Sequence, residues 1–345
     1  FEKMNLKTTV KPLAGYSSWY NRYQDISQKT IIEDLEGCRR ILQKGDLFQI
    51  DDGWEVAVGE WEQDKEKFPS SMKEIVDEIH KSGYLSGLWL APFVVEEKSR
   101  IFKEHKDWLL EIDGEKFKCG CNWSGFWALD IDNVEVQEYL KRVFKTVYED
   151  WGFDLVKLDF LYAAAPKAKN NETRSQRMNR AMDFLLSLSK DKLILGCGVP
   201  LASAFGRTQY CRVSCDVTLD WDDKIWMKLI HSERPSTKRA LETSFERRML
   251  NMGAFITDPD VFFLRRDNIH LSEKKKMTLA LFDALNKGLF LTSDNPSLYT
   301  EREIEEYRRL RHIWEKGKIT SIERGKKTII HYCVDDKNES LVLPF

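Results

Sequence analysis

The chain has 345 residues, of which 54 are basic and 56 acidic, and its formal net charge is −2 with a pI near 6.4. Because charges of both signs are mixed along the chain, a nucleic-acid or membrane-surface partner has no support. The length is ample for a sizeable core, and an α/β barrel can use most of it as one domain. No apolar run approaches the length of a transmembrane helix, and no signal peptide is visible.

The cysteines form no recognisable metal or disulfide pattern. Their number is odd, and the Cys119-x-Cys121 pair has no second pair at zinc-ligand spacing. We interpret most of them as reduced, packed thiols and expect a cytoplasmic protein. They stand at positions 38, 119, 121, 197, 211, 215 and 333.

Short apolar strands alternate with amphipathic helices along the first part of the chain. Gly and Pro bound the strands, and each helix opens with Ser or Thr followed three residues later by Glu, which is a capping box. The expected order is a strand at 12–20, a helix from Thr30 with Glu33 to Gly45, a strand at 46–51, a helix from Ser71 with Glu74 to Gly83, and a strand at 85–90.

A long excursion from 93 to 132 follows, and part of it is expected to form a hairpin beside the main fold. The alternation of strands and helices then resumes. The expected order is a helix capped by Asp132 or Asn133, a strand at 153–159, a helix at 172–189, strands at 192–197 and 211–214, a helix at 237–251, a strand at 253–257, a helix at 272–286, a strand at 288–292 and a helix at 301–315.

Eight apolar strands alternating with helices predict a parallel α/β protein, and their number favours a closed (β/α)8 TIM barrel. No Gly-rich nucleotide-binding sequence follows any strand, which counts against an open nucleotide-binding sheet. From 318 onward the pattern changes to short alternating segments. We therefore expect a catalytic barrel over residues 1–315 and the start of a small C-terminal β element over 316–345.

The fourth strand carries two charges. Lys157 and Asp159 share one face of an apolar stretch that runs from Val156 to Tyr162, because side chains alternate along a strand. Two charges in a buried strand are costly unless they pair or take part in chemistry. For the isolated strand, a structural pair explains the pattern at least as well as a catalytic role does.

Acidic residues recur where other strands end, which in a barrel is the rim that carries the active site. One Asp after a strand could be a helix N-cap, but five strand ends with Asp are hard to explain as caps. These residues are Asp51 and Asp52 after the second strand, Asp159 after the fourth, Asp216 after the sixth, Asp258 and Asp260 after the seventh, and Asp294 after the eighth.

Three chemistries that use an acidic rim fit poorly. A zinc hydrolase needs histidines there, and all six lie in predicted helices, loops or the tail. A magnesium site needs a hard ligand after the fifth strand, where Cys197 stands. A phosphate site would be repelled by Asp258 and Asp294. The pattern therefore favours glycoside hydrolysis by paired carboxylates, with no metal or other cofactor.

The residues at these strand ends resemble the catalytic barrel of glycoside hydrolase family 36, the α-galactosidases of the melibiase type. The similar segments occur in family order and cover residues 12 to 300. They are Gly15–Tyr20, Phe48–Trp54, Gly87–Phe93, Asn122-Trp123 with Trp127–Asp130, Lys157–Leu161, Leu195–Pro200, Arg212 with Asp216, and Asp258-Pro-Asp260. Family members usually add a large N-terminal β-sandwich and a fuller C-terminal β domain.

The resemblance implies a retaining α-galactosidase for substrates such as melibiose and raffinose. It implies that Asp159 is the nucleophile and Asp216 the general acid/base, and that Asp51 and Asp52 hold the galactose 4- and 6-hydroxyls. The further sugar-binding residues that it implies are Trp19, Tyr20, Trp89, Lys157, Cys197, Gly198, Arg212 and Trp221.

The residues themselves agree in part with this mechanism. Lys157 lies two residues from Asp159 on the same face, where a cation lowers the pKa of a carboxyl group. Arg212 shares the face of Asp216, and its effect depends on which carboxylate it touches. A retaining enzyme holds its two carboxyl groups about 5–5.5 Å apart and an inverting enzyme about 6.5–9.5 Å.

Other functions stay open. The chain could act on α-N-acetylgalactosamine, with the loop from Cys197 to Phe205 accommodating the acetamido group, or transfer galactose as related raffinose synthases do. It could also be a catalytically silent sugar-binding barrel. In each case we expect a small carbohydrate as the partner, no nucleic acid and no membrane, and a homo-oligomer as the candidate assembly.

Overall fold

The computed structural model describes residues 4, 6, 8–169, 171–223 and 234–345. The chain divides into two compact units, and each is described by itself. The first consists of Phe1–Asn21, Glu33–Leu47 and Arg212–Phe345, and the second of Arg22–Ile32 and Phe48–Cys211. Within the described residues, every helix is too short or too polar to span a bilayer.

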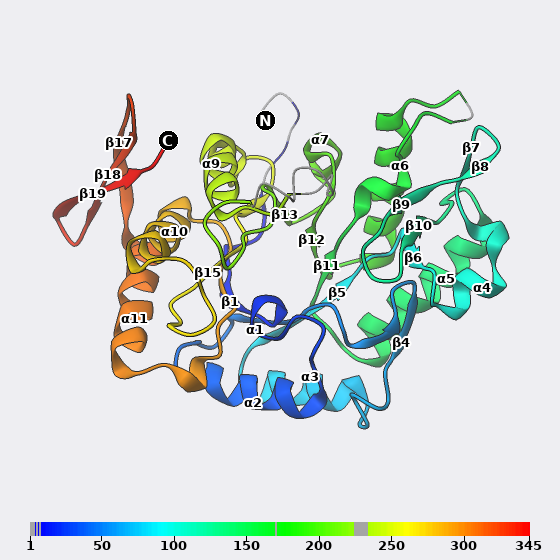
Figure 1. The fold of residues 1–345 in the computed structure, drawn as a ribbon, viewed down its shortest axis with the longest axis horizontal. Coiled ribbons are helices and arrows are strands. Elements are labelled where there is room, and N and C mark those ends of the chain that lie inside the picture. The colour runs from blue at the N-terminus through cyan, green and yellow to red at the C-terminus, as the bar shows by residue number, and fades with distance from the viewer. Residues whose placement is uncertain (1–3, 5, 7, 170, 224–233) are drawn as a thin grey trace. The chain divides into compact units, whose positions relative to one another are not determined.

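Parallel strands form the centre of the second unit (Figure 1). β11 (Leu155–Leu158) lies between β5 (Leu85–Leu90) and β12 (Leu193–Gly196), and all three run in the same direction. β2 (Leu47–Ile50) lies beside β5, and β13 (Tyr210–Arg212) lies beside β12. Their residues are almost all buried, as expected for a parallel sheet that is covered on both faces.

The register of this sheet aligns the ends of its strands. Leu158 of β11 pairs with Leu90 of β5 on one side and with Gly196 of β12 on the other. The residues that follow these strands, Asp159 and Cys197 among them, therefore leave the sheet along one edge. In parallel α/β barrels this C-terminal edge carries the functional residues.

Helices connect the strands, and side-chain caps fix where several of them begin. Ser71 accepts a hydrogen bond from Lys73 N at 3.2 Å and opens α3 (Met72–Lys81), as predicted. Asn133 accepts one from Glu135 N at 2.8 Å and opens α5 (Val134–Lys145). The other helical segments of this unit are α4 (Arg100–Glu104), η2 (Lys106–Trp108), the π-helical turn η3 (Thr146–Asp150), η4 (Leu161–Ala164), α6 (Arg174–Ser189) and α7 (Leu201–Ala204).

One predicted cap is wrong. The expected box at Thr30 with Glu33 lies inside α2 (Gln28–Cys38). The cap is instead Ser27: its N–H donates to Thr30 Oγ1 at 2.8 Å, and Thr30 N donates to Ser27 Oγ at 3.3 Å. The residue three positions after Ser27 is Thr30, whose hydroxyl takes the place of the Glu side chain of a capping box, so the expected Ser/Thr and Glu pattern did not identify Ser27.

The excursion between residues 93 and 132 contains small antiparallel sheets, which confirms the predicted hairpin. β10 (Phe126–Ala128) pairs with β6 (Val94–Glu96) on one side and β9 (Lys118–Gly120) on the other. Two further hairpins lie in this unit, β3 (Glu55–Ala57) with β4 (Glu60–Gln63), and β7 (Glu111–Ile112) with β8 (Glu115–Lys116).

The first unit repeats the parallel pattern. β16 (Phe290–Thr292) pairs in parallel with β1 (Ala14–Ser17) and with β15 (Val261–Phe262). Phe290 stacks on Phe262 with ring centroids 4.4 Å apart, which fills the core beside these strands. The other elements are α1 (Trp19–Arg22), α9 (Thr237–Arg247), η5 (Arg248–Leu250), β14 (Ile256–Asp258), α10 (Glu273–Asn286), η6 (Pro296–Leu298) and α11 (Glu301–Lys316).

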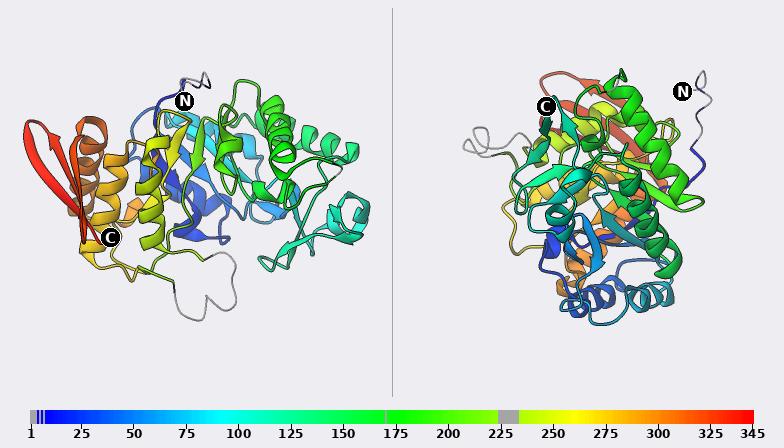
Figure 2. Two further views of the ribbon diagram at one scale, coloured as in Figure 1. Left: turned by 90° about the horizontal axis from the view of Figure 1, so that it is seen from above. Right: turned by 90° about the vertical axis from the view of Figure 1, so that its right-hand side faces the viewer.

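The C-terminal residues form a separate antiparallel sheet, in line with the β character predicted after residue 316. β18 (Thr328–Val334) is its central strand, between β17 (Lys318–Arg324) and β19 (Lys337–Leu343). Figure 2 shows this sheet in red beside α10 and α11 in orange. The predicted domain boundary between 315 and 316 stays a prediction.

Candidate active site

A buried ion pair joins the ends of β2 and β11. Lys157 Nζ lies 2.8 Å from Asp51 Oδ2, and only 8% and 3% of the two side chains are exposed. Gln49 Nε2 donates to the same oxygen at 2.9 Å, and Asp52 N donates to Asp51 Oδ1 at 3.1 Å. The partner of Lys157 is thus an acid 106 residues away in the chain. The predicted effect of Lys157 on the pKa of Asp159 stays a prediction.

Asp159 directly follows β11, and both of its carboxylate oxygens accept hydrogen bonds. Phe160 N donates to Oδ1 at 2.7 Å, and Trp89 Nε1 of β5 donates to Oδ2 at 3.2 Å. Its own amide donates to Leu90 O at 2.8 Å, which ties the residue to the neighbouring strand. The carboxylate is therefore held in one orientation at the edge of the sheet, and the residue is only partly buried.

Two bulky residues beside these acids have left-handed backbones. Trp123 has φ 53° and Phe160 has φ 52°, in a region that residues other than Gly seldom occupy. Their rings contact each other with centroids 5.1 Å apart, and Trp123 also contacts Trp89 at 6.2 Å. Trp123 Nε1 donates to Asp52 Oδ2 at 2.9 Å. Backbone strain of this kind clusters at functional sites because the surrounding packing maintains it.

The end of β12 approaches Asp159 through the backbone. Gly198 has φ 64°, and a Cβ at this position would lie 3.2 Å from Phe160 N. The thiol-bearing Cys197 is 5% exposed, and its amide donates to Leu158 O at 2.8 Å. The structure therefore places both predicted residues next to the segment that follows Asp159, and Gly198 is required there by conformation and by space.

In the first unit, one arginine contacts three aspartates. Arg212 is 2.8 Å from each of Asp216, Asp258 and Asp260, through Nη1, Nε and Nη2 respectively. The side chains of Asp258 and Asp260 are buried, at 0% and 2% exposed, whereas 53% of that of Asp216 is exposed. The guanidinium of Arg212 thus pairs with two buried acids and with Asp216, which is the one of these three acids that is exposed to solvent. The sequence left open which carboxylate Arg212 contacts, and in the structure it contacts Asp216, Asp258 and Asp260.

Asp258 and Asp260 also hold the loop after β14. Asp260 N donates to Asp258 Oδ1 at 2.9 Å, which is an Asx-type hydrogen bond. Asp260 Oδ2 accepts hydrogen bonds from Val217 N and from the Tyr20 hydroxyl, each at 2.8 Å. These bonds fix the position of Arg212 and, through Val217, the backbone next to Asp216.

The aromatic residues predicted for the sugar site in this unit differ in their surroundings. Tyr20 is 5% exposed, and burial together with the charges of Asp216 and Asp260 raises the pKa of its hydroxyl well above the ordinary value. Trp19 is half-buried at the start of α1. Trp221 is half-buried, and its ring lies 5.1 Å from Lys275 Nζ of α10.

Sequence reasoning assigned no site role to Trp123 or Phe160. Trp123 lies in one of the segments that resemble glycoside hydrolase family 36, and Phe160 directly follows Asp159. Their positions in the sequence were therefore the only indication that they belong to the site. Their left-handed backbones have no sequence signature, because aromatic residues avoid that region.

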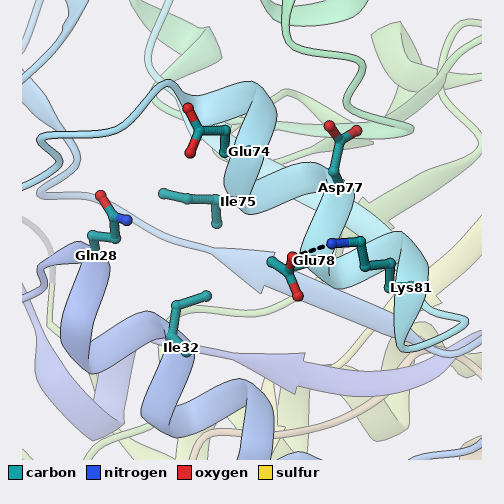
Figure 3. Close-up of a pocket in the computed structure, with 7 residues that line it drawn as sticks. All are labelled: Gln28, Ile32, Glu74, Ile75, Asp77, Glu78 and Lys81. Atoms are coloured by element: carbon teal, nitrogen blue, oxygen red, sulfur yellow. Dashed lines mark hydrogen bonds and ion pairs between the residues drawn. The ribbon is translucent and has the colours of Figure 1, made fainter.

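A pocket shown in Figure 3 lies elsewhere in the second unit. It is lined by the start of α2, with Gln28 and Ile32, and by α3 with Glu74, Ile75, Asp77, Glu78 and Lys81. Lys81 pairs with Glu78 across one turn of α3. None of the predicted site residues lines this pocket, and its polar groups are ordinary solvated helix residues.

Carboxylates at the C-terminal ends of parallel strands, beside indole and phenyl rings, define a barrel of the glycoside hydrolase class. The chain belongs to the Melibiase family, whose sequence profile matches residues 2–193. The matched region includes Asp51, Asp52, Lys157 and Asp159, and it ends before Arg212.

The relatives are α-galactosidases. Mel36A of Lactobacillus acidophilus is 23% identical over 164 residues, which are 46% of this chain and 22% of that protein. TtGalA of Thermus thermophilus, in complex with p-nitrophenyl α-D-galactopyranoside, is 29% identical with a TM-score of 0.82, over 96% of this chain and 67% of that one. A family 36 α-galactosidase, AgaA of Geobacillus stearothermophilus, is 16% identical with a TM-score of 0.66, over 97% of this chain and 47% of that one, and shows the shared fold alone.

These neighbours confirm the predicted (β/α)8 class of the fold. The chain spans well under two thirds of the length of the curated relatives that it matches, for example 22% of Mel36A and 20% of the α-galactosidase/sucrose kinase AgaSK of Mediterraneibacter gnavus.

Proposed function

We propose that this chain is the catalytic barrel of a retaining α-galactosidase, which hydrolyses terminal α-linked galactose from oligosaccharides such as melibiose and raffinose. The observation that carries the proposal is Asp159, which stands at the end of β11 with Phe160 N and Trp89 Nε1 on its two oxygens. It lies in the region that matches the family, and the relative TtGalA binds an aryl α-galactoside.

In this proposal Asp159 is the nucleophile. One carboxylate oxygen forms a bond to the anomeric carbon while the bond from that carbon to the leaving oxygen breaks, which gives a galactosyl-enzyme. The two donors keep the carboxylate from rotating, so the attacking oxygen is already oriented when the sugar binds.

Asp216 is the proposed general acid/base. It gives a proton to the leaving oxygen in the first step, and in the second it accepts a proton from the water that attacks the anomeric carbon. The 53% exposure of its side chain supports this role, because leaving groups and water must both reach it. Arg212 holds it through one nitrogen while the two buried acids anchor the guanidinium.

Asp51, Asp52 and Lys157 are the proposed sugar-binding groups of the second unit. Carboxylates accept hydrogen bonds from hydroxyls and an ammonium donates to them, so the set suits a neutral polyhydroxyl ligand. Trp123 is half-buried and contacts Trp89 beside these groups, so its ring suits the apolar face of a galactose, while Trp89, at 2% exposed, packs behind it. Cys197 and Gly198 bound the same region from β12, and Trp19, Tyr20, Arg212 and Trp221 complete the proposed set from the first unit.

The test is hydrolysis of p-nitrophenyl α-galactoside, with the product anomer followed by NMR. We expect α-galactose as the first product. Asp159→Ala should lose turnover and regain it with azide as β-galactosyl azide, whereas Asp216→Ala should give α-galactosyl azide. Asp77→Asn, at an exposed Asp of α3, is the control. A β-configured first product, or full activity in Asp159→Ala, would contradict the proposal.

The same assay separates the alternatives. Faster turnover of p-nitrophenyl α-N-acetylgalactosaminide would favour the N-acetyl sugar, and galactosyl transfer to sucrose in place of water would favour a transferase. Tight galactose binding without hydrolysis would favour a silent binding barrel.

We also infer a cytoplasmic protein, because all seven cysteines are free thiols. Titration of protein purified without reductant should find seven thiols, and cell fractionation tests the location. A homo-oligomer stays a prediction, to be tested by sedimentation.

A further inference from the structure

Glu96 is a buried acid at the end of β6 that the proposed mechanism does not use. It is 1% exposed, and both of its carboxylate oxygens accept hydrogen bonds from other segments. Val58 N donates to Oε1 at 2.9 Å, and Ser124 Oγ donates to Oε2 at 2.9 Å. Lys98 Nζ lies 3.3 Å from Oε1, but 59% of its side chain is exposed, so this ion pair does little to fix the acid. The carboxylate is therefore held mainly by Val58 and Ser124.

The two segments that meet at Glu96 both adjoin the candidate site. Val58 lies in the turn between β3 and β4, the hairpin that follows Asp52, and Val58 O also accepts the Glu96 amide at 3.0 Å. Ser124 directly follows Trp123, whose Nε1 donates to Asp52 Oδ2 at 2.9 Å. One carboxylate therefore connects the hairpin after Asp52 with the turn that supplies a hydrogen-bond donor to Asp52.

This turn is closed by its own backbone and anchored through Ser124. Gly125 N donates to Asn122 O at 2.9 Å, which closes the turn. The hydroxyl of Ser124 accepts the amide of Lys98 at 2.9 Å while it donates to Glu96. Because the hydroxyl is engaged both as acceptor and as donor, it fixes the turn against the segment that follows β6.

Trp123 has a backbone conformation in this turn that an indole seldom takes. Its φ is 53°, and a positive φ in a turn is ordinarily supplied by Gly, Asn or Asp. Such a conformation persists only when the surrounding structure maintains it. If the turn relaxed, the indole would move away from Asp52. The bond between Ser124 and Glu96 acts on the residue next to Trp123 and therefore opposes this relaxation.

We propose that Glu96 is a positioning residue for the sugar site. Through Ser124 it holds the turn of Trp123, and through Val58 it holds the hairpin after Asp52. The indole is thereby fixed against Asp52 in the geometry that receives galactose. This inference rests on the proposed function, in which Asp52 and Trp123 bind the sugar. Its consequence is that loss of the Ser124 hydroxyl weakens sugar binding although both proposed catalytic acids are unchanged.

The first test compares Ser124→Ala with Ser124→Thr on p-nitrophenyl α-galactoside. Ser124 is exposed, so both variants should fold, and Ala leaves Glu96 its bond to Val58. Ser124→Ala should raise KM about tenfold and change kcat less than about twofold, because the binding-competent turn becomes a minor population. Ser124→Thr keeps the hydroxyl and should keep KM within about twofold of the wild type. Glu96→Met, with a similar length and no oxygen, should raise KM at least as much as Ser124→Ala.

Trp123→Gly tests whether the effect passes through the indole. It removes both the ring and the unfavourable φ, so Ser124 has nothing left to position. KM should rise in this variant, and adding Ser124→Ala should change it by less than about twofold more. Ser187→Ala is the matched control and should keep the wild-type KM, because Ser187 is an exposed serine of α6 whose hydroxyl bonds Phe184 O in the same helix. The proposal is overturned if Ser124→Ala keeps the wild-type KM, or if its full effect persists beside Trp123→Gly.

The indole N–H of Trp123 provides a test without substrate. In protein labelled with ¹⁵N-tryptophan, its NMR resonance is the one lost in Trp123→Gly. Ser124→Ala should shift or broaden this resonance and Ser124→Thr should restore it, whereas an unchanged resonance in Ser124→Ala would overturn the proposal. If the wild type fails to cleave the galactoside, the proposed function fails, and the indole resonance still decides whether Ser124 holds Trp123. Circular dichroism confirms that each variant is folded.

Discussion

Replacing Lys157 with Met should destabilise the fold strongly, because it leaves Asp51 as a buried charge without its cation. Removing one partner of a buried ion pair costs about 3–5 kcal/mol. Asp51 keeps the donors Gln49 Nε2 and Asp52 N, at 2.9 and 3.1 Å. These bonds offset part of the loss, so we expect a decrease of about 3 kcal/mol in the free energy of unfolding.

A double-mutant cycle isolates the pair. Lys157→Met, Asp51→Asn and the double variant are unfolded in urea, and tryptophan fluorescence and circular dichroism should give coincident transitions. We expect the double variant to be more stable than the sum of the single losses predicts, by about 2 kcal/mol. Lys141→Met breaks an exposed pair with Glu138, at 48% and 53% exposure, and is the control. It should cost under about 0.5 kcal/mol.

The reasoning would be refuted if Lys157→Met lost less than about 1 kcal/mol, the range of an exposed pair. Additive single losses would refute it as well, because they would mean that Lys157 and Asp51 do not act on each other.

Three further changes test other parts of the structure. Burial, Asp260 and Asp258 raise the pKa of Asp283 well above its ordinary value of 3.8, and neither oxygen has a hydrogen-bond partner among the described residues. The unfolded chain therefore releases this proton first, and the contribution of Asp283 to stability falls by about 1.4 kcal/mol per pH unit until the pH reaches the folded pKa. Asp283→Asn should remove that slope. In chemical denaturation at neutral pH it should be more stable than the wild type, and an unchanged slope would contradict a raised pKa of Asp283. Phe160→Gly should be more stable than Phe160→Ala by about 1 kcal/mol, against the usual order in strands and helices, because φ is positive. Equal stabilities would show that the backbone at Phe160 is relaxed. Gly198→Ala should lower kcat for the aryl galactoside and destabilise the fold by about 1 kcal/mol, because its Cβ would meet Phe160 N, and wild-type behaviour would show that this contact yields.

Local patterns predicted the elements whose boundaries the sequence itself marks. The strand at Leu85–Leu90 was predicted to the residue, because Gly83 and Pro92 bound its apolar run. Ser71 was predicted as a cap and is one. The predicted cap at Thr30 failed because the pattern required Glu three residues after the cap, whereas Ser27 is followed there by Thr30, whose hydroxyl accepts the Ser27 amide instead.

The site was predictable as a set of strand-end acids, and its internal partners were not. Alternation placed Lys157 and Asp159 on one face, yet the ion pair of Lys157 is with Asp51, an acid from a distant strand. A sequence pattern predicts on which face of a strand a side chain lies, but it does not predict which groups that side chain contacts. The same holds for Tyr20, whose hydroxyl bonds Asp260, 240 residues further along the chain.

The left-handed backbones of Trp123 and Phe160 have a consequence for the order in which the molecule folds. Each conformation is unfavourable by roughly 1–2 kcal/mol in an isolated segment, so each is only a minor population before its ring has found a partner. Their mutual contact provides that partner only after residues 123 and 160 have been brought together. We therefore expect the sheet to condense first and the turns at Trp123 and Phe160 to form late. In a kinetic analysis, substitutions of these two rings should accelerate unfolding and leave the folding rate nearly unchanged.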